Sequence, residues 1–503
     1  MNKAEAYLSG RGVISISRNA IYMLGGRGIN ITVRFVYAIV LATYFGPRLY
    51  GLLNYGISWY LAFLPLTGLG LGMILSREIG RDRTEGARFV ATTFTLRIVV
   101  AFFAAMVCGF VGWFSEWGLE ARKLLLFFSA ALIGRSVAIW AQQVFTAYEA
   151  NKYSFQLQAI FRPLEVVFGL AFVFIRAGII AIAAVHALSW WLQAFCGMVL
   201  IRRYMVKVRL DCAWSSMKRI LAQSLPVGVG VIMVNWLLHG PLVLFRHIAG
   251  NDNSLGQLAL SMQAFMVLSN LPIATSSAAL PVLSRTVERR DGKDLLFVEI
   301  ILRSTFIVGA AGGLLGLIAG PGLVNSVFGT RFSMAGHLLG PVLWLLIPWT
   351  IGNALWRVYL ARGHFFIPTV FTGVGALVLT FCMPWLVALM DTPGAVVAAG
   401  AGISVWAFGL VLMLERSGEI ITGRVVFRPL ATALAALGVY FLLRHLSIWI
   451  VLPASFLTLL GGVLAFGVFS TAEFSALVST MRMIFPFSAP RQADNFKNKR
   501  GFQ

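Results

Sequence analysis

Charged residues are scarce in this sequence. Only 12% of its 503 residues are Asp, Glu, Lys or Arg, whereas 59% are hydrophobic, and the mean hydropathy is +0.83. A soluble domain carries about a quarter charged residues, so the composition excludes an ordinary soluble enzyme. It also excludes an intrinsically disordered chain, which would be poor in apolar residues. The sequence therefore predicts an all-α protein that crosses a membrane many times.

Catalytic and metal-binding motifs are also missing. The four cysteines lie in or beside apolar runs without CxxC spacing, which argues against a disulfide framework or a zinc site. The chain has no HExxH, GxSxG or P-loop motif, and the GxGxG pattern at 68–72 lies inside an apolar run rather than after a strand. We therefore expect no cofactor and no enzymatic activity. The lack of a large polar loop counts against a membrane glycosyltransferase, which is the enzymatic alternative.

Apolar runs that are long enough to cross a bilayer recur along the whole chain. A transmembrane helix needs about 20 such residues, and fourteen segments fit this length. They lie near 17–45, 51–75, 89–114, 123–148, 155–175, 179–201, 221–248, 257–283, 295–320, 336–361, 365–389, 394–414, 428–446 and 451–471. The first run is too long for a cleavable signal peptide and contains Arg27 and Arg34, so we expect it to be retained as a helix.

Lys and Arg gather in alternate connections between these spans. An even number of spans puts both termini on one side, and most of the 41 Lys and Arg fall in connections on that side, including 202–220. The positive-inside rule then predicts that both termini are cytoplasmic. This bias accounts for the net charge of +22 without a nucleic-acid partner. We expect the basic loops to contact anionic lipid headgroups instead.

The two halves of the chain share short motifs. The sequence Leu-Ser-Arg at 75–77, at the end of the second span, recurs at 283–285 at the end of the eighth, and Arg97 and Arg303 follow at nearly the same offset. Because six spans separate the copies, the halves should share one topology about a pseudo-two-fold axis along the membrane normal. We expect an N-lobe over 1–220 with its basic loop, a C-lobe over 221–414, two further helices over 415–471, and a cytoplasmic interfacial helix with a basic tail over 472–503.

Polar side chains form a stripe on three of the predicted spans, the first, the fourth and the seventh, and the stripe of the seventh consists of Asn235, His239 and Arg246. In the first, Arg27 and Arg34 are seven residues apart and therefore lie on one helix face, with Asn30 beside them. In the fourth, Arg135 and Gln142 repeat this spacing. A charge at membrane depth costs at least about 2.5–3.5 kcal/mol, so these arginines either pair locally with carbonyls and side chains or line a cavity. Because no acid accompanies them on their own helices, we favour a cationic cavity for an anionic ligand.

Few groups remain that could carry an ion across the membrane. Glu165 lies three residues after Arg162 and Glu299 four before Arg303, spacings that allow local neutralisation. His239 fits a hydrogen-bonded core histidine better than a proton carrier. If transport is coupled to an ion, His239, Glu165 and Arg162 are the candidates by elimination. Arg97 and Arg303, as related positions in the two halves, are candidates for gate or structural residues.

Three stretches of the sequence, at 42–51, 280–285 and 327–335, match motifs of one family. Together they resemble the polysaccharide transporter branch of the multidrug/oligosaccharidyl-lipid/polysaccharide (MOP) exporter superfamily, the Wzx-type oligosaccharide flippases. Residues 42–51 are similar to the turn that follows the first helix of those flippases. Residues 280–285, Leu-Pro-Val-Leu-Ser-Arg, are similar to the end of their eighth span. Residues 327–335 are similar to the outer loop that follows their ninth span. In topology the resemblance extends over nearly the whole chain.

The resemblance implies a two-lobed transporter in the bacterial inner membrane. Such a protein flips a polyprenyl-diphosphate-linked oligosaccharide from the cytoplasmic to the outer leaflet by alternating access, for exopolysaccharide, capsule or O-antigen synthesis, alongside a polymerase or export machinery. On this basis Arg27, Arg34 and Arg135 would hold the diphosphate or an acidic sugar, and Asn30 and Gln142 would contact hydroxyls. The alternatives are a cation-coupled multidrug exporter of the same superfamily and a membrane scaffold of a polysaccharide assembly complex.

Overall fold

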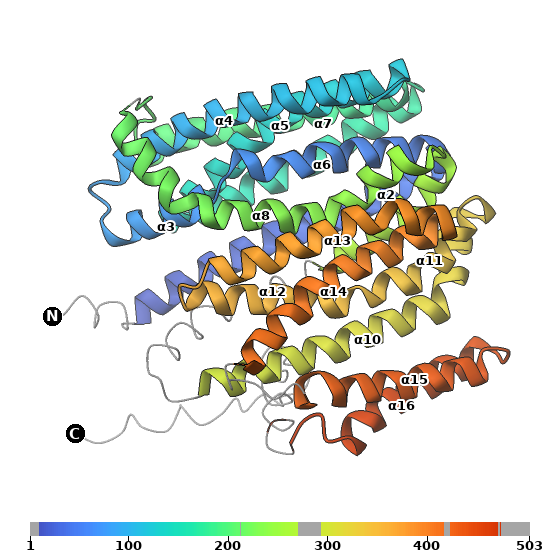
Figure 1. Ribbon diagram of the computed structural model, residues 1–503. Helices are drawn as coiled ribbons and strands as arrows, with labels where there is room; N and C mark the ends of the chain where they lie inside the picture. Colours follow the sequence, from blue (N-terminus) through green and yellow to red (C-terminus); the bar gives the residue numbers. More distant parts are fainter. Residues whose placement is uncertain (1–9, 212, 270–292, 417–422, 471–472, 474–503) are drawn as a thin grey trace, which may run out of the picture.

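The computed structural model describes residues 10–211, 213–269, 293–416, 423–470 and 473, and almost all of them are helical (Figure 1). A helix over 252–269 carries no label in the figure. The labelled elements are α2 (Gly10–Phe63), α3 (Leu71–Arg81), α4 (Gly86–Ser115), α5 (Leu119–Ala147), α6 (Asn151–Phe174), α7 (Gly178–Tyr204), α8 (Trp214–Ala249), α10 (Lys293–Phe328), α11 (Ser333–Trp344), α12 (Leu346–Ala361), α13 (Phe366–Met390), α14 (Thr392–Arg416), α15 (Arg428–Leu443) and α16 (Ile448–Ala465). Short helical turns η1 (Leu64–Thr67), η2 (Thr330–Phe332) and η3 (Gly423–Phe427) join some of them.

Twelve helices among the described residues are long and apolar enough to cross a membrane. The first two expected spans appear together in α2, which Gly46 divides because its φ of +68° interrupts the helix. Pro47 then begins the second part, where its missing N–H costs nothing. The eighth expected span is described only as far as residue 269, and the repeated motif at 283–285 lies outside the described residues. The prediction of a polytopic, all-helical membrane protein is confirmed.

The second span is broken where the GxGxG pattern stands. α2 ends at Phe63 and is followed by the turn η1. α3 begins after Gly70, whose φ of +75° suits glycine. A Cβ on Gly70 would lie 2.8 Å from the carbonyl oxygen of Ser224 on α8. The glycines therefore allow the break to pack directly against α8, and they form no nucleotide-binding loop.

The helices pack as two bundles and a separate hairpin (Figure 1). In the first bundle α5 packs on α4 and α7, and α2 packs on α6. In the second, α13 packs on α14 and α8, while α10 packs on α11 and α12. Contacts between α2 and α8 join the bundles, and the α15–α16 hairpin packs on α10. The division of the chain into lobes at residues 220 and 414 stays a prediction.

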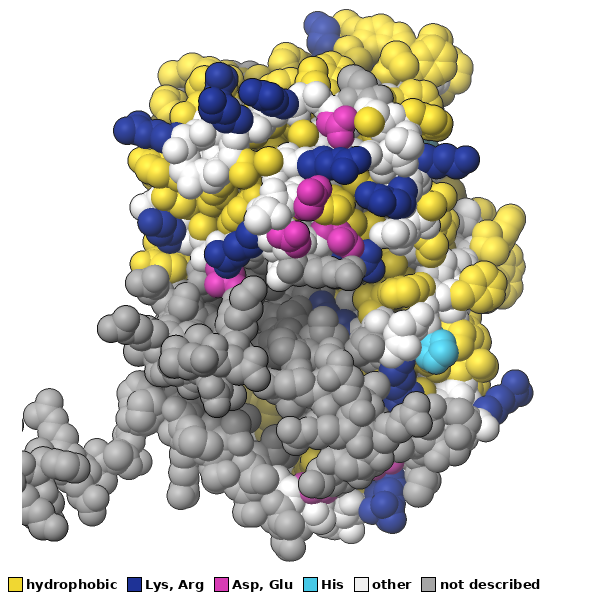
Figure 2. Space-filling model, turned by 90° about the vertical axis from the view of Figure 1, so that its left-hand side faces the viewer, with side chains coloured by type: hydrophobic (Ala, Val, Ile, Leu, Met, Phe, Trp, Pro, Cys, Tyr) yellow, Lys and Arg dark blue, Asp and Glu magenta, His cyan; other side chains and the backbone are white. Residues whose placement is uncertain are grey.

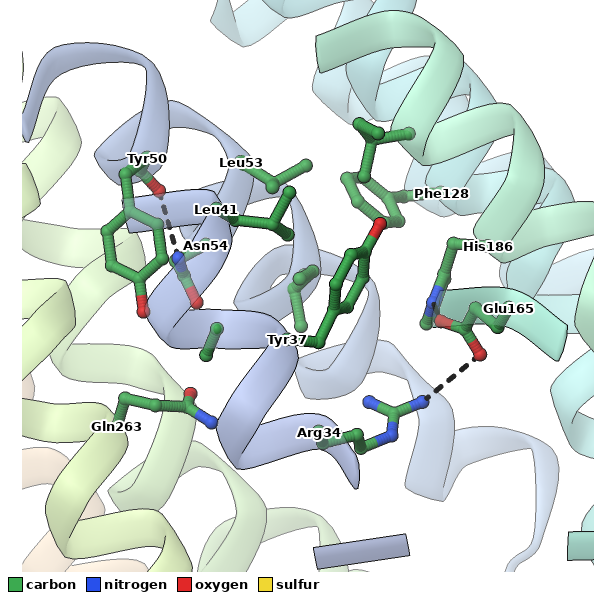
Figure 3. A pocket seen from close by; sticks show the side chains of 13 residues that line it. Arg34, Tyr37, Leu41, Tyr50, Leu53, Asn54, Phe128, Glu165, His186 and Gln263 are labelled. Carbon is green, nitrogen blue, oxygen red and sulfur yellow. Dashed lines mark hydrogen bonds and ion pairs between the residues drawn. The ribbon is translucent and has the colours of Figure 1, made fainter. Parts of the chain in front are cut away.

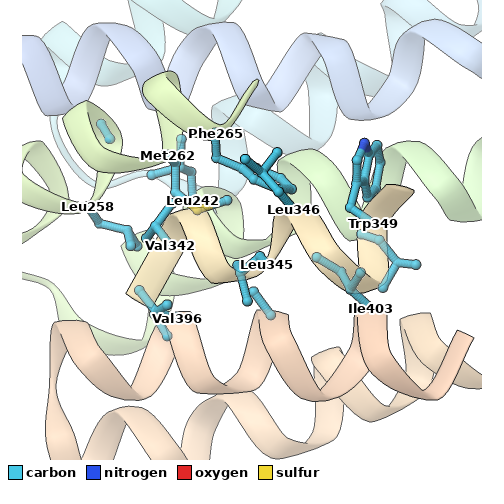
Figure 4. Close-up of a cluster of buried hydrophobic side chains, with 14 of the residues drawn as sticks. Leu242, Leu258, Met262, Phe265, Val342, Leu345, Leu346, Trp349, Val396 and Ile403 are labelled. Carbon is cyan, nitrogen blue, oxygen red and sulfur yellow. The ribbon is translucent and has the colours of Figure 1, made fainter. Parts of the chain in front are cut away.

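The interior of the second bundle is apolar. Figure 4 shows part of this core, in which Phe265, Trp349 and their neighbours meet between α12, α14 and the helix over 252–269. The rings of Trp349 and Trp406 lie 5.7 Å apart. Lipid tails are as apolar as these side chains, so close packing rather than transfer from water holds the helices together. The buried charges described below belong mainly to the first bundle.

Among the described residues, most of the exposed Lys and Arg lie at one end of the molecule. This basic end contains the connections 82–85, 148–150 and 205–213. Figure 2 looks onto it and shows Lys and Arg around a smaller group of Asp and Glu. Some of these groups form exposed ion pairs, such as Arg83 with Glu149 at 3.7 Å.

The connection between α7 and α8 is shorter than the expected 202–220, because both helices extend into it. Its Asp211 carboxylate accepts hydrogen bonds from the Thr92 hydroxyl of α4 and from the backbone N–H of Ala213. The Asp211 N–H donates to the Thr95 hydroxyl at 2.9 Å. These bonds lower the pKa of the Asp211 carboxyl group. A single acid thus fixes the connection between the two bundles to α4.

The two bundles also touch at the opposite end, which contains Gly46 and 250–251. A Cβ on Gly256 would lie 2.0 Å from the Pro47 carbonyl oxygen, and one on Gly51 would lie 2.6 Å from the Gly256 nitrogen. Only glycine allows this backbone contact. Beside it, Arg246 of α8 pairs with the buried Glu116 at the end of α4, at 3.0 Å.

Candidate functional site

A pocket opens among α2, α5, α6, α7 and the helix over 252–269 (Figure 3). About 650 Å³ of space lies within it when the open solvent at its mouth is counted. The polar side chains that line it are Arg34, Tyr37, Tyr50, Asn54, Glu165, His186 and Gln263. Since Gln263 comes from beyond α8 and the others from the first bundle, the pocket lies where the two bundles meet.

One carboxylate and three guanidinium groups form the charged part of this site. Glu165 lies midway along α6 and is buried, and its Oε2 pairs with Arg162 of the same helix. Arg34 of α2 reaches the same oxygen at 3.9 Å, as the dashed line in Figure 3 shows. Arg135 of α5 donates to the Tyr60 hydroxyl at 2.5 Å. With one acid for three arginines, the cluster keeps an excess of positive charge.

A histidine completes the polar network. His186 of α7 places Nδ1 2.6 Å from Glu165 Oε1 and Nε2 2.8 Å from the Tyr60 hydroxyl. Tyr60 therefore connects Arg135 to His186, and His186 connects Tyr60 to Glu165. Both histidine and tyrosine are buried.

The three guanidinium groups surround one indole ring. Their central carbons lie 4.0 Å (Arg162), 4.7 Å (Arg135) and 5.8 Å (Arg34) from the ring centre of Trp190. These distances suit cation–π attraction, which is worth about 0.5–2 kcal/mol each depending on desolvation. Trp190 is 5% exposed, so the contacts are shielded from water.

Several buried donors in this cluster have no hydrogen-bond partner among the described residues. They are Nε of Arg34, Nε of Arg135, Nε of Arg162 and Nε2 of Gln193, and the Arg34 terminal nitrogen that pairs with Glu165 at 3.9 Å is also beyond hydrogen-bond distance. A buried donor that lacks a partner costs about 1–3 kcal/mol, and more when it is charged. The arrangement therefore favours a ligand that brings several acceptor oxygens, and an anion would also offset the excess charge.

Two glycines bring these helices close enough to form the cluster. A Cβ on Gly134 would lie 2.8 Å from the backbone nitrogen of Trp191, so α5 and α7 cross at this point. The crossing sets Arg135 beside Trp190. A Cβ on Gly169 would overlap the Tyr37 hydroxyl at 1.9 Å, so α6 can approach α2 only with glycine there.

The structure brings together some of the predicted ligand-binding residues. Arg34 and Arg135 both contact the ring of Trp190. Gln142 lies two turns from Arg135 toward the basic end, outside the pocket lining. Asn30 lies one turn before Arg34 on α2, and its Oδ1 is buried without a hydrogen-bond partner in the described part of the chain. The side chain of Arg27 lies outside the described residues. The ligand-binding roles of all five stay predictions.

The related residues Arg97 and Arg303 have different surroundings. Arg97 is buried, its Nε donates to the Ser136 hydroxyl at 2.8 Å, and a Cβ on Gly68 would lie 3.0 Å from it. It therefore braces the break in the second span against α5. Arg303 donates to the Val468 carbonyl at 2.7 Å and pairs with Glu473 at 3.0 Å. It attaches the end of the α15–α16 hairpin to α10.

The predicted ion-coupling candidates fall in two places. Arg162 and Glu165 pair as their spacing suggests, and the pair lies midway along α6, inside the cluster. His239 of α8 is buried, and its Nδ1 has no hydrogen-bond partner among the described residues. An ion-coupling role for these three residues stays a prediction.

Sequence reasoning missed the contribution of α7. His186, Trp190 and Gln193 follow one another at spacings of four and three, the same one-face pattern that singled out Arg27 and Arg34. Gln193 accepts from Arg162 at 2.7 Å. The stripe is recognisable in the sequence, but it carries no formal charge, and a search for buried arginines does not find it. Within the described residues no group of His, Cys, Asp and Glu could hold a metal ion.

The sequence matches one known protein family. A family model described as "Polysaccharide biosynthesis protein" matches residues 16–287. No curated protein sequence matches the chain.

Solved structures of similar shape are transporters and flippases. A structure described as the lipid II flippase MurJ in an inward closed conformation has a TM-score of 0.66 at 13% identity, covering 92% of this chain and 99% of that one. A multidrug resistance MATE family transporter of the MOP superfamily in an inward-facing conformation has a TM-score of 0.63 at 13% identity, covering 79% and 98%. A MOP superfamily transporter from Pyrococcus furiosus has a TM-score of 0.60 at 14% identity, covering 80% and 95%. These similarities confirm the predicted MOP exporter fold.

Proposed function

The chain belongs to the polysaccharide biosynthesis protein family, and we propose that it is a flippase for a polyprenyl-diphosphate-linked oligosaccharide. The observation that carries this proposal is the group of Arg34, Arg135 and Arg162 around a single carboxylate, with unpartnered guanidinium N–H groups beside a pocket. Arginine binds phosphate oxygens in pairs better than any other side chain. A diphosphate offers both the charge and the acceptors that this cluster lacks.

The proposal uses the two-bundle architecture for alternating access. The pocket lies between the bundles, and the contact of Gly51 with Gly256 joins them at the opposite end. We assign the N-lobe, the C-lobe and the last two helices to 1–220, 221–414 and 415–471, with a cytoplasmic tail after them. Release and renewal of the glycine contact would expose the pocket to each side in turn, while the lipid tail stays in the bilayer.

The proposed setting is a bacterial inner membrane with the basic end in the cytoplasm. Exposed Lys and Arg at that end would bind anionic lipid headgroups. The glycan would serve exopolysaccharide, capsule or O-antigen synthesis, next to a polymerase or export machinery. The protein would act on the position of its substrate and leave its bonds unchanged, so it is proposed as a transporter rather than an enzyme.

The test is leaflet accessibility of the glycan in proteoliposomes. Purified protein is reconstituted with a polyprenyl-diphosphate oligosaccharide, and a membrane-impermeant glycosidase reads the sugar exposed on each face. Wild-type protein should expose inner-leaflet sugar, whereas Arg34→Ala and Arg135→Ala should slow this by at least about tenfold, the effect of losing one charged hydrogen bond. Arg202→Ala, which removes an exposed arginine at the end of α7, is the matched control and should leave the rate unchanged.

The same assay separates the alternatives. A multidrug exporter would leave the glycan lipid in place but move a lipophilic cation. A scaffold would move neither, and loss of the cavity arginines would not affect it. Equal flipping by wild-type protein and both cavity variants, with folding verified by a monodisperse gel-filtration peak, would contradict the cationic cavity.

A further inference from the structure

Trp190 holds an unusual position in the cluster. Three guanidinium groups from α2, α5 and α6 lie around its ring, at 5.8, 4.7 and 4.0 Å from the ring centre. Like charges this close repel one another, and Glu165 is the only carboxylate that the described contacts place between them. The electron-rich faces of the indole supply further attraction without adding an acid. The ring can thus hold the arginines together without occupying their N–H groups.

The indole N–H also fixes the state of His186. It lies 3.1 Å from His186 Nε2, and an indole nitrogen can only donate. His186 Nε2 must therefore accept, which leaves the ring proton on Nδ1. From there it donates to Glu165 Oε1 at 2.6 Å. In this tautomer His186 is neutral, and it turns the Glu165 carboxylate so that Oε2 faces Arg162 and Arg34.

We propose that Trp190 and His186 are a positioning pair for the anion site. Trp190 spaces the three guanidinium groups so that they can bind two linked phosphates at once. His186 holds the Glu165 carboxylate in the position where it pairs with Arg162 and Arg34. Neither residue needs to touch the ligand. This inference rests on the proposed function, because it assumes that the cluster binds the diphosphate of the substrate.

The neighbouring Trp191 is a natural control. It is 42% exposed, and its indole N–H donates to the Ala130 carbonyl at 3.0 Å. Its residue type and helix are the same as those of Trp190, but none of the described guanidinium–ring contacts involves it. Substitution of Trp191 should therefore affect the membrane-facing surface of α7 and leave the anion site intact.

The test measures binding of inorganic pyrophosphate and of inorganic phosphate to the full chain in detergent, by isothermal titration calorimetry. Trp190→Leu removes the ring and should weaken pyrophosphate binding about tenfold or more. Trp190→Phe keeps an aromatic face but loses the N–H, and should weaken it by only about two- to fivefold. Trp191→Leu should bind like the wild type. In His186→Gln, glutamine cannot orient the Glu165 carboxylate as histidine does. Its pyrophosphate affinity should lie between those of the two Trp190 variants.

The ratio of the two affinities distinguishes positioning from general damage. A variant that is merely less well folded loses phosphate and pyrophosphate binding in equal proportion. Loss of positioning lowers the preference for pyrophosphate, because two linked phosphates need the guanidinium groups at a fixed spacing. Unchanged pyrophosphate binding or an unchanged ratio in Trp190→Leu would overturn the inference. Equal losses in Trp190→Phe and Trp190→Leu would overturn it too, because a phenyl face retains the stacking.

The outcome for wild-type protein separates this inference from the proposed function. Wild-type protein that flips the glycan lipid while Trp190→Leu binds pyrophosphate equally well contradicts the positioning pair alone. Wild-type protein that neither binds pyrophosphate nor flips the lipid contradicts the flippase proposal, and the positioning pair fails with it. If Trp190→Leu does not fold, the ratio of pyrophosphate to phosphate affinity is compared between wild-type protein, Trp190→Phe and His186→Gln instead.

Discussion

Replacement of Glu165 by Gln tests the charge balance of the site most simply. The substitution keeps the shape of the side chain but removes the negative charge that Arg162 and Arg34 share. At the 3.9 Å between Glu165 and Arg34, two unit charges interact by about 4 kcal/mol in a medium of effective dielectric constant 20. Loss of one partner of a buried ion pair costs about 3–5 kcal/mol in measured cases. Because the Gln amide oxygen can still accept a hydrogen bond from Arg162, we expect the free energy of unfolding to fall by about 3 kcal/mol, the lower end of that range.

The assay is denaturation in mixed micelles, with and without pyrophosphate. Without the anion, Glu165→Gln should lower the free energy of unfolding by about 3 kcal/mol. With pyrophosphate, the variant should be stabilised more than the wild type, because the anion then relieves repulsion that the carboxylate otherwise offsets. The control is Glu149→Gln, which removes an exposed ion pair with Arg83 and should cost at most about 1 kcal/mol. A Glu165→Gln variant as stable as the wild type, with an unchanged response to pyrophosphate, would refute the reasoning.

Three further predictions concern the framework around the site. Gly256→Val should abolish flipping because its side chain overlaps the facing backbone, whereas Gly438→Val, at a position with open space around it, should leave flipping intact in the same proteoliposome assay. Arg303→Ala should release the α15–α16 hairpin by removing its bonds to the Val468 carbonyl and Glu473, and faster proteolysis after residue 416 would reveal this. The hydrogen bonds of Asp211, which hold the α7–α8 connection against α4, should persist at neutral pH. Because hydrogen bonds hold the pKa of its carboxyl group below the ordinary value of about 3.9, its contribution is present above that value and is lost as the pH falls through the lowered pKa. Proteolysis of 205–213 by an acid-active protease should therefore accelerate only in strongly acidic buffer, and equal protection of Asp211→Asn at neutral pH would contradict this.

The fold follows from the sequence to a large extent because membrane spans leave a strong signal. Long apolar runs must be helical in lipid, where each backbone polar group needs an internal partner. The boundaries were therefore predictable except where a helix breaks inside a span. In the sequence, Gly46 and Gly70 cannot be told apart from the other glycines of the membrane helices. Their positive φ angles set them apart in the structure, and at Gly70 so does the close approach of the α8 backbone.

The candidate site was predictable only in part. Seven-residue spacing identified Arg34 and Arg135 as facing inward, since a charge at membrane depth needs a purpose. The role of Glu165 was read as local because Arg162 is close in sequence, whereas its contact with Arg34 depends on how α2 packs against α6. His186 and Trp190 matter through contacts with other helices. A pattern on one helix cannot reveal such contacts.

The pair Arg97 and Arg303 shows a different limit. Their equivalent positions in the two halves suggested a common role, but the structure gives each its own partners. Arg97 meets a helix break that the first half contains, and Arg303 meets a hairpin that follows the second half. A repeat in sequence predicts equivalent positions in space, while the residues that surround them can differ.

The measurement that tests the central claim most directly compares lipids of different charge in one flipping assay. Wild-type protein in proteoliposomes is given the same oligosaccharide on a polyprenyl diphosphate, on a polyprenyl monophosphate and on an uncharged polyprenyl carrier, and the impermeant glycosidase reads each. If Arg34, Arg135 and Arg162 bind the diphosphate, the first lipid should flip fastest and the uncharged one at the protein-free rate. Equal protein-dependent rates for all three lipids would contradict the account, because the cationic cluster would then play no part in recognition.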